Sequence, residues 1–262
     1  MPDHAPRLFR EMTWAEIADA ARADIPIAIP IGSTEQHGHH LPVCTDWVIP
    51  EHLLAAASRR CDLIVGQFIP FGYRSRPGSG GGQHFPGTLS LRATTFIALL
   101  EDILGELKRC GFRNIVLYNW HFENSGFIYE PAYLVAERHP ELKIVVIEDA
   151  NPDFTADRQQ AIWPDGFPGL ALEHAAVIET SLLLYHEPAL VRTERIAADA
   201  PERVVNYDVL PIDTRMSTAS GTLSSPEAAS ADKGRMLTEW MVDRLVAILD
   251  DEFADRRGTS PM

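Results

Sequence analysis

The sequence predicts an α/β fold, a wound and mostly parallel sheet flanked by helices, in a single domain that covers residues 1–262. Short apolar segments with the composition of buried strands alternate with longer segments in which apolar residues recur at helical spacing. Crossover helices of this length join parallel strands. No stretch has the composition of a linker between domains, and 262 residues suffice for one sizeable core.

The first half of the chain supplies three of the expected strands. A short helix over residues 14–23 precedes a buried strand over 25–31, whose two prolines favour an edge or irregular position in the sheet. The other elements expected in this half are a helix over 47–60, a strand over 62–69, a helix over 92–110 with Gly111 just beyond its end, and a strand over 114–119.

The second half is expected to hold a helix over 126–138, a strand over 142–148 and a helix over 173–186. Residues 188–224 are rich in Pro, Asp and Thr and are expected to be irregular; long ordered loops of this kind often pack against a site or a neighbouring subunit. Ser225 as N-cap and Pro226 as first residue predict the start of a final helix.

Composition excludes several classes of partner. The 37 acidic against 23 basic residues give a formal net charge of -14, which disfavours nucleic acid and anionic membrane surfaces. Three scattered cysteines indicate reduced thiols rather than a disulfide framework, although Cys44 must be considered as a catalytic thiol. No apolar run approaches the length of a membrane span, and no secretory leader is evident, so we expect a cytoplasmic protein that acts on a small molecule.

Two polar clusters follow predicted strands. The first, STEQHGHHLPVCTD at 33–46, contains Glu35, His37 and Asp46; the second, NWHFENS at 119–125, contains His121 and Glu123. Strand ends converge at the carboxyl edge of a wound sheet, where ligands bind. Residues two apart on an extended chain point the same way, so each cluster can direct one carboxylate and one imidazole at a common point.

This pattern predicts two metal ions. Each could receive one imidazole and one carboxylate, and Asp46, with two oxygens, could bridge them. Two divalent cations would balance the three carboxylates and one bound hydroxide. Mixed nitrogen and oxygen ligation suits Zn²⁺ or Mn²⁺, and an ion pair about 3.5–4 Å apart lowers the pKa of a bridging water towards neutrality.

Other residues near these clusters have two interpretations each. Ser79, in a glycine-rich loop, could hold a substrate carbonyl or belong to a plain connector. His174 could protonate a leaving nitrogen, or cap a helix or make a surface contact. Glu179 could orient His174 or a metal ligand. His39 and His40 are interpreted as polar loop residues outside the metal ligands.

Several stretches together resemble the creatininase (creatinine amidohydrolase) family: IPIGSTEQHGHHLPVCTD, FGYRSRPGSGGGQHFPGT, NWHFENSGF, PDGFPGLALEHAAVIETS, YDVLPID and GTLSSPEAAS. The resemblance runs in order through nearly the whole chain. It implies a creatininase-like fold, an amidohydrolase with two divalent ions, Zn and/or Mn, and a homohexamer as the usual assembly.

The resemblance also implies roles for single residues. Five side chains would be metal ligands: Glu35, Asp46 and His121 at one ion, and His37, Asp46 and Glu123 at the other. Ser79 matches a substrate-contacting serine. His174 matches the catalytic histidine of the family, and Glu123 is assigned a catalytic role beside it.

The chain departs from true creatininases around the substrate. They carry Gly and Tyr on either side of the second-cluster histidine, where this chain has Trp120 and Phe122. They carry Trp and Asp ahead of the Glu-His pair, where Leu170 and Ala171 stand here. The family's aromatic residues stack on flat creatinine. We therefore expect Trp120, Phe122 and Leu170 to line the substrate pocket here and to contact the substrate differently from the residues of true creatininases.

Another pocket tryptophan of the family falls near Ala150, and Trp163 or Trp120 could refill the pocket from another direction. We therefore predict a metal-dependent amidohydrolase that opens a small cyclic amide such as creatinine, a lactam or a hydantoin. A metal-bridging hydroxide would attack the carbonyl and His174 would protonate the ring nitrogen. The alternatives are hydrolysis of a linear formamide or of a cyclic ketone of inositol type, and a non-catalytic binding protein that keeps the site for stability.

Overall fold

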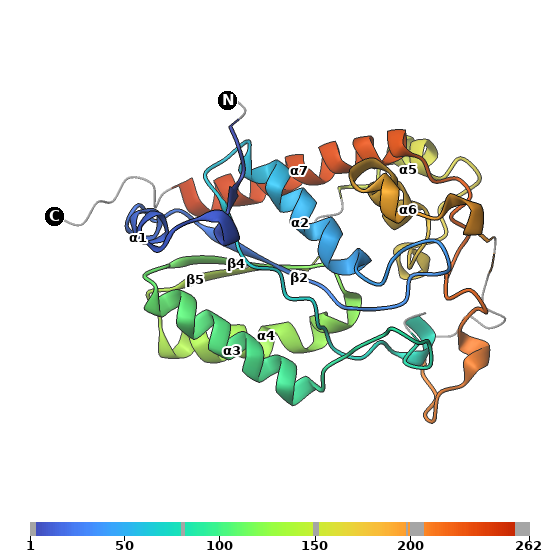
Figure 1. The fold of residues 1–262 in the computed structure, drawn as a ribbon, viewed down its shortest axis with the longest axis horizontal. Coiled ribbons are helices and arrows are strands. Elements are labelled where there is room, and N and C mark those ends of the chain that lie inside the picture. Colours follow the sequence, from blue (N-terminus) through green and yellow to red (C-terminus); the bar gives the residue numbers. More distant parts are fainter. Residues whose placement is uncertain (1–3, 80–81, 149–151, 198, 200–206, 255–262) are drawn as a thin grey trace.

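In the computed structural model, described for residues 4–79, 82–148, 152–197, 199 and 207–254, a five-stranded parallel sheet lies between two layers of helices (Figure 1). The strands run in the order β1-β3-β2-β4-β5, and each neighbouring pair is parallel. Their bounds are β1 Arg7–Leu8, β2 Ile27–Ile31, β3 Ile64–Val65, β4 Asn114–Asn119 and β5 Lys143–Ile147. The predicted fold class is confirmed.

The helices divide between the two faces of the sheet. Those described are α1 Trp14–Arg22, α2 Thr45–Ser58, α3 Ala93–Arg109, α4 Ser125–Arg138, α5 Ala156–Ile162, α6 Val177–His186 and α7 Ala231–Phe253. Figure 1 shows α3 and α4 on one face and α2 and α7 on the other. Short 3₁₀ turns lie at Phe9–Glu11, Pro77–Ser79, Phe122–Asn124, Leu170–Leu172, Pro188–Leu190, Thr193–Arg195 and Thr214–Met216.

Two hydrophobic cores form because successive strand residues point to opposite faces. On β2, Ala28 joins the core of α2, α6 and α7, whereas Ile27 and Ile29 join the core of α3 and α4. On β4, Val116 and Leu117 divide in the same way. Strands β2 and β4 are thus buried on both faces, which is why the sequence shows largely apolar runs there. In the described part of the chain, no helix is both long and apolar enough to span a bilayer.

The prediction that β2 is an edge or irregular strand is wrong. It lies in the centre of the sheet, between β3 and β4. Its prolines are tolerated there because their carbonyl oxygens still take part in the sheet hydrogen bonds. Pro26 O accepts a hydrogen bond from Ile64 N, and Pro30 O accepts one from Ile69 N. Strand β3 ends at Val65 and is much shorter than the strand expected over 62–69, and beyond it an isolated parallel bridge between Ile31 and Ile69 continues the pairing.

Two helices begin later than predicted. The helix expected from residue 173 begins at Val177, because Ala175 adopts a positive φ of 53° that interrupts a helix. The last helix begins at Ala231, where Ser230 Oγ accepts from Lys233 N at 3.2 Å, rather than at Ser225–Pro226. Helix α5 was not predicted, although Thr155 caps it by accepting from Arg158 N at 3.4 Å.

A half-buried histidine pair between α2 and α6 makes stability depend on pH. The rings of His52 and His186 stack at 4.7 Å, and His186 Nε2 lies 2.9 Å from Thr238 Oγ1. Burial, and then the nearby His52, lowers the pKa of His186 to about 4. The unfolded chain, with an ordinary histidine pKa near 6.5, therefore binds more protons between these values, and stability is lost as the pH falls through this window.

We expect His186→Gln to remove part of this acid sensitivity. The free energy of unfolding of the metal-free wild type should fall by about 1–2 kcal/mol more than that of the variant between pH 6.5 and 4.5. Urea denaturation of both chains in the presence of a chelator measures the difference. Parallel losses in the two chains would show that His186 is not responsible.

Candidate metal centre

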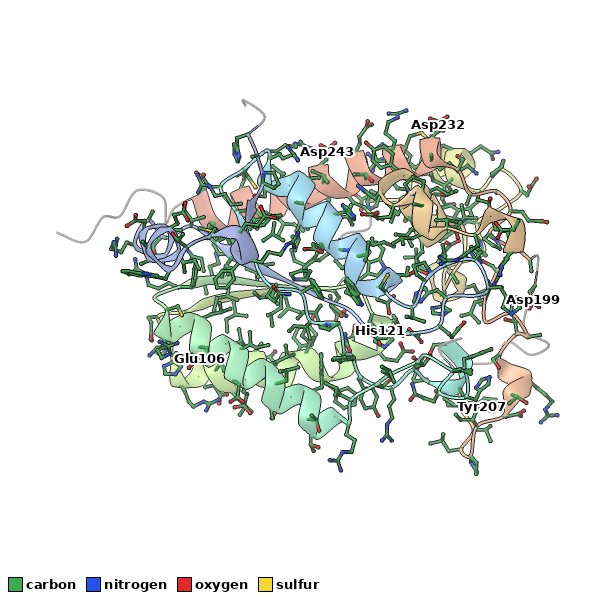
Figure 2. The ribbon with its side chains drawn as sticks, in the orientation of Figure 1. Glu106, His121, Asp199, Tyr207, Asp232 and Asp243 are labelled. Carbon is green, nitrogen blue, oxygen red and sulfur yellow. The ribbon has the colours of Figure 1, made fainter. Side chains whose placement is uncertain are left out.

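Acidic and imidazole side chains gather at the carboxyl ends of β2 and β4. The loop after β2 supplies Glu35 and His37, the loop after β4 supplies His121, and Asp46 lies in the first turn of α2. Figure 2 shows His121 at this end of the sheet, toward the loop of Tyr207, with which it lines one cavity. The sequence-based expectation that these clusters meet at one sheet edge corresponds to what the structure shows.

Asp46 is brought to the sheet by a close backbone approach at Gly32. A Cβ added to Gly32 would lie well inside contact distance of the Asp46 carbonyl and of Trp47 N. The start of α2 therefore rests directly on the end of β2. Only glycine leaves room for this contact.

Gly32→Ala should accordingly destabilise the protein by about 3 kcal/mol, because neither backbone segment can yield without moving α2. It should also weaken metal binding, since Asp46 moves with α2. Gly105→Ala is the matched control: this glycine lies inside α3 with no heavy atom within 4 Å of an added Cβ. That substitution should stabilise by roughly 0.5–1 kcal/mol. Urea unfolding of both variants tests the pair of expectations, and equal stabilities would refute them.

Asp46 stands between two groups of possible metal ligands. His121 Nδ1 lies 3.1 Å from Glu35 Oε2 and 3.2 Å from Asp46 Oδ2. On the other side, His37 Nε2 lies 3.0 Å from Asp46 Oδ1 and 3.6 Å from Glu179 Oε2. Each oxygen of Asp46 therefore faces a different imidazole. This is the arrangement required of a carboxylate that bridges two ions.

The chemistry of these donors fits divalent cations. All five side chains are buried, and apart from these ion-pair contacts His37 Nε2 and Asp46 Oδ2 have no hydrogen-bond partner among the described residues. Burial opposes charge on His37, but Asp46 and Glu179 raise its pKa well above the usual value. Burial likewise opposes charge on Asp46, yet His37 and His121 lower its pKa. Buried carboxylates here hold positive charge tightly, and metal ions can take the place of protons.

Outer contacts fix which imidazole nitrogen faces the ligands. His37 Nδ1 lies 3.1 Å from the carbonyl oxygen of Glu35, and His121 Nε2 lies 3.0 Å from that of Tyr73. Ser75 Oγ donates to Glu35 Oε1. These contacts leave His37 Nε2 and His121 Nδ1 directed at the centre. Sequence reasoning missed Tyr73 and Ser75, which carry no spacing signal in the loop GYRSRPG.

Glu123 lies on the far side of His121 from the other ligands. Its Oε2 is 3.5 Å from His121 Nε2, and its Oε1 accepts from Ser79 Oγ and, at 3.4 Å, from Arg76 N. It belongs to neither of the two groups that share Asp46. The structure places Glu179 in the position beside His37 that the sequence interpretation gave to Glu123.

Glu179, in the first turn of α6, is held by both oxygens. Oε1 accepts from Trp120 Nε1 at 3.2 Å, and Oε2 accepts from Ala175 N at 2.7 Å. The positive φ of Ala175 turns its N–H toward this carboxylate. The interruption that delays the start of α6 therefore also fixes Glu179 against His37.

His174 faces the same cluster from the loop before α6. Its ring centroid lies 4.4 Å from that of His37, and its Nε2 lies 3.0 Å from Gln36 O. The Gln36 side chain, anchored at 2.9 Å on Gly221 O, also reaches His174 Nε2 at 2.9 Å. His174 thus lies beside the ligands, outside the two groups that share Asp46.

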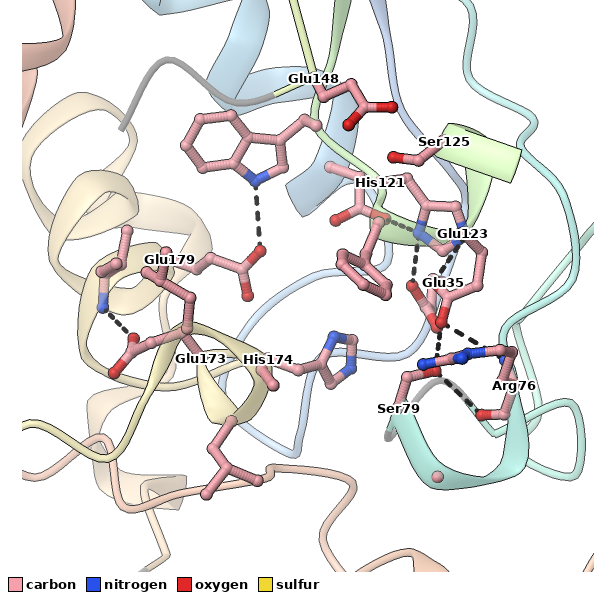
Figure 3. A pocket seen from close by; sticks show the side chains of 18 of the residues that line it. Glu35, Arg76, Ser79, His121, Glu123, Ser125, Glu148, Glu173, His174 and Glu179 are labelled. Carbon is pink, nitrogen blue, oxygen red and sulfur yellow. Dashed lines mark hydrogen bonds and ion pairs between the residues drawn. The ribbon is translucent and has the colours of Figure 1, made fainter. Parts of the chain in front are cut away.

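One cavity of about 700 Å³ opens onto the metal ligands and His174 (Figure 3). All four predicted substrate-binding residues line it: Ser79, Trp120, Phe122 and Leu170. Phe122 is 65% exposed and Leu170 45%, so both stand at the mouth. Trp163 does not line this cavity; it is buried against Phe154 and Phe167 and donates to Glu173 Oε1 at 2.7 Å. Ala150 lies outside the described residues.

The remaining residues singled out in the sequence lie apart from the ligands. His40 is buried with Nε2 2.9 Å from Thr180 Oγ1, and burial lowers its pKa to about 4. Cys44 is half-buried, and burial raises the pKa of its thiol. A thiol with a raised pKa is a poor nucleophile. His39, His40 and Cys44 do not occur in any group of three donors found among the described residues.

Comparison with known proteins decides the family. The creatininase family model, described as creatinine amidohydrolase, matches residues 10–249. This chain belongs to the creatininase family. It is 38% identical over 252 residues to creatinine amidohydrolase of Pseudomonas putida, covering 93% of this chain and 96% of that one. It is 31% identical over 253 residues to a mycofactocin precursor peptide peptidase of Mycobacterium tuberculosis, covering 88% and 89% of the two chains.

Solved creatininase structures superpose closely on this fold. A manganese form has a TM-score of 0.90 at 36% identity, covering 95% of this chain and 99% of the other. A glutamate-to-glutamine variant in a Zn–Zn form and one complexed with creatine each match with a TM-score of 0.90 at 35% identity and the same coverage. The predicted family and the predicted Zn or Mn cofactors are confirmed at the level of the family, and the chain is a creatininase-family hydrolase.

Proposed function

We propose that this protein hydrolyses the C–N bond of a small cyclic amide, such as creatinine or a related lactam or hydantoin, with two divalent ions. The observation that supports this proposal most strongly is the placement of Asp46. Its two oxygens face the separate imidazoles of His37 and His121 at the floor of one cavity. The family match supports a hydrolase of C–N bonds. The ring substrate goes beyond that match.

Five residues would bind the two metal ions, and a sixth would donate a proton to the leaving group. One ion would lie among Glu35, Asp46 and His121, and the other among His37, Asp46 and Glu179, with Zn²⁺ and/or Mn²⁺ as the ions. Bound there, the pair would supply a Lewis acid for the carbonyl and an acidified water. His174, at the edge of the same cluster, would give a proton to the departing ring nitrogen.

Glu123 is free for a second role because it lies outside the two ligand groups. Its carboxylate lines the cavity and is oriented by Ser79 Oγ. We assign it the proton that the attacking water loses, which it could pass across the cavity to His174. Ser79 remains a substrate-contacting residue in this proposal, since its hydroxyl also lines the cavity.

The walls of the cavity are compatible with several small cyclic amides and do not select creatinine among them. Trp120 lines it but is tied to Glu179, and Phe122 and Leu170 are exposed at its mouth. These residues form a looser enclosure than a pair of stacking tryptophans would, so we propose a small cyclic amide as the class rather than creatinine itself. The peptidase among the relatives shows that related chains do act on other amides.

A substrate panel assayed with Mn²⁺ and with Zn²⁺ tests this function. It comprises creatinine, hydantoin, a five-membered lactam, a formamide and an inosose-type ring ketone. We expect ring amides to be hydrolysed and hydrolysis to cease with a chelator. Turnover of only the formamide or the ketone would replace the proposal with the corresponding alternative. Chelation that lowers the melting temperature without turnover of any member would indicate a binding protein.

We also propose that the chain acts in the cytoplasm as a homohexamer, as the resemblance to the family implies. Light scattering should then give about six times the chain mass of 29.1 kDa. A mass of one or two chains would contradict the hexamer.

A further inference from the structure

The cavity contains a single strong base. Among the described residues that line it, Arg76 is the only lysine or arginine, and every other formally charged side chain is a carboxylate. An arginine so placed has either a local carboxylate as its partner or an anionic ligand. The geometry around Arg76 distinguishes these two cases.

Local contacts position the Arg76 guanidinium but leave most of its N–H donors without an acceptor among the described residues. Its carbon lies 5.6 Å from the centre of the Phe122 ring, and its Nε forms a long ion pair of 3.8 Å with Asp208 Oδ2, which leaves both terminal nitrogens of the fork without a carboxylate among the described residues. The other oxygen of Asp208 accepts from Gly78 N at 2.8 Å. No side-chain N–H of Arg76 donates a hydrogen bond to a described residue, and the side chain is 55% exposed. Its remaining donors are therefore available to a ligand.

These donors face the reacting groups. Figure 3 shows the Arg76 side chain beside Ser79, directed into the cavity toward the side of His174. The backbone N of the same residue donates to Glu123 Oε1 at 3.4 Å, so Arg76 is anchored beside a carboxylate that lines the same cavity. The cavity volume of about 700 Å³ leaves space for a substituent beyond one small ring.

We propose that Arg76 determines specificity by binding a carboxylate carried by the substrate, which makes the preferred substrate an anionic cyclic amide. The planar fork of an arginine matches a carboxylate through two parallel hydrogen bonds. The carboxylate would project from the ring on the side away from the scissile bond. The inference rests on the proposed function, because it assigns a substrate class to the same site.

Hydantoin and hydantoin-5-acetic acid form a matched neutral and anionic pair for the test. The Mn²⁺-loaded wild type should show a kcat/KM at least about tenfold higher for the acid, and Arg76→Gln should lower this ratio by roughly 10- to 100-fold, mainly through KM. Arg76→Lys should recover part of it, since charge remains without the fork. Arg74→Gln is the control and should keep the ratio, because Arg74 lines a neighbouring cavity and not this one.

Equal kcat/KM for the two rings in the wild type, or an unchanged ratio in Arg76→Gln, would overturn the inference. If neither ring is hydrolysed, the proposed function fails for this pair, and binding of N-carbamoyl-aspartate and N-carbamoyl-glycine decides the inference separately. Calorimetry on the metal-loaded chains should then show that the wild type prefers the extra carboxylate and that Arg76→Gln does not. The same preference in both chains would overturn it.

Discussion

Asp46→Ala should abolish metal binding and activity together. Both oxygens of Asp46 face ligand groups, so its loss removes the shared member of both. We expect the metal content to fall from two ions per chain to well below one, and kcat/KM to fall by roughly 10⁴-fold or more. Elemental analysis and the ring-amide assay on the same preparation measure the two losses.

Two variants separate this effect from unfolding. Asp46→Asn keeps the shape of the side chain and should also lose metal, since an amide is a weaker ligand without charge. Asp62→Ala removes an exposed carboxylate that pairs with Arg7 at 3.4 Å, and it should leave metal content and activity unchanged. Circular dichroism establishes that each variant is folded. A folded Asp46→Ala protein with two ions, or with wild-type turnover, would refute the shared-aspartate centre.

His174→Gln should lower kcat by about 10²- to 10⁴-fold while both metals remain. His174 lies outside the two groups that share Asp46, and its proposed task is to protonate the leaving nitrogen. The loss should therefore be smallest for amides whose leaving nitrogen needs no proton. Steady-state kinetics and elemental analysis of the same preparation measure the rate and the metal content.

His52→Gln is a matched control for this substitution. His52 lies on α2 against His186, away from the cavity, and its variant should retain both the rate and the two ions. A His174→Gln protein that loses one ion would contradict the assignment. It would then favour the alternative donor group formed by Glu35, His37 and His174.

Local sequence signals predicted the layers of the fold but not all element boundaries. Helical periodicity and apolar runs indicated the helices and the buried strands, because burial on both faces leaves a continuous apolar pattern. The predicted start of α7 was wrong because Ser225–Pro226 has the residue types of a helix start, whereas Ser230 is the residue that caps the helix. The start of α6 depends on Glu179 bonding the Ala175 N–H, a contact that spacing cannot reveal.

The candidate site was predictable where the chain is extended and not where it turns. Residues two apart share a direction only on extended backbone. Glu35 and His37 come together as this spacing predicts, whereas Phe122–Asn124 forms a 3₁₀ turn that carries Glu123 to the far side of His121. Glu179 approaches His37 only because α6 packs on α2, which is a tertiary contact. Arg76 had no distinguishing signal in the glycine-rich loop.

We propose that Asp46 joins two ions, one toward His121 and one toward His37. Anomalous scattering from crystals grown with Mn²⁺ or Zn²⁺ tests it most directly. We expect two peaks about 3.5–4 Å apart, both within bonding distance of Asp46, with Glu179 at the ion beside His37. A single peak, or two peaks of which only one contacts Asp46, would contradict the account.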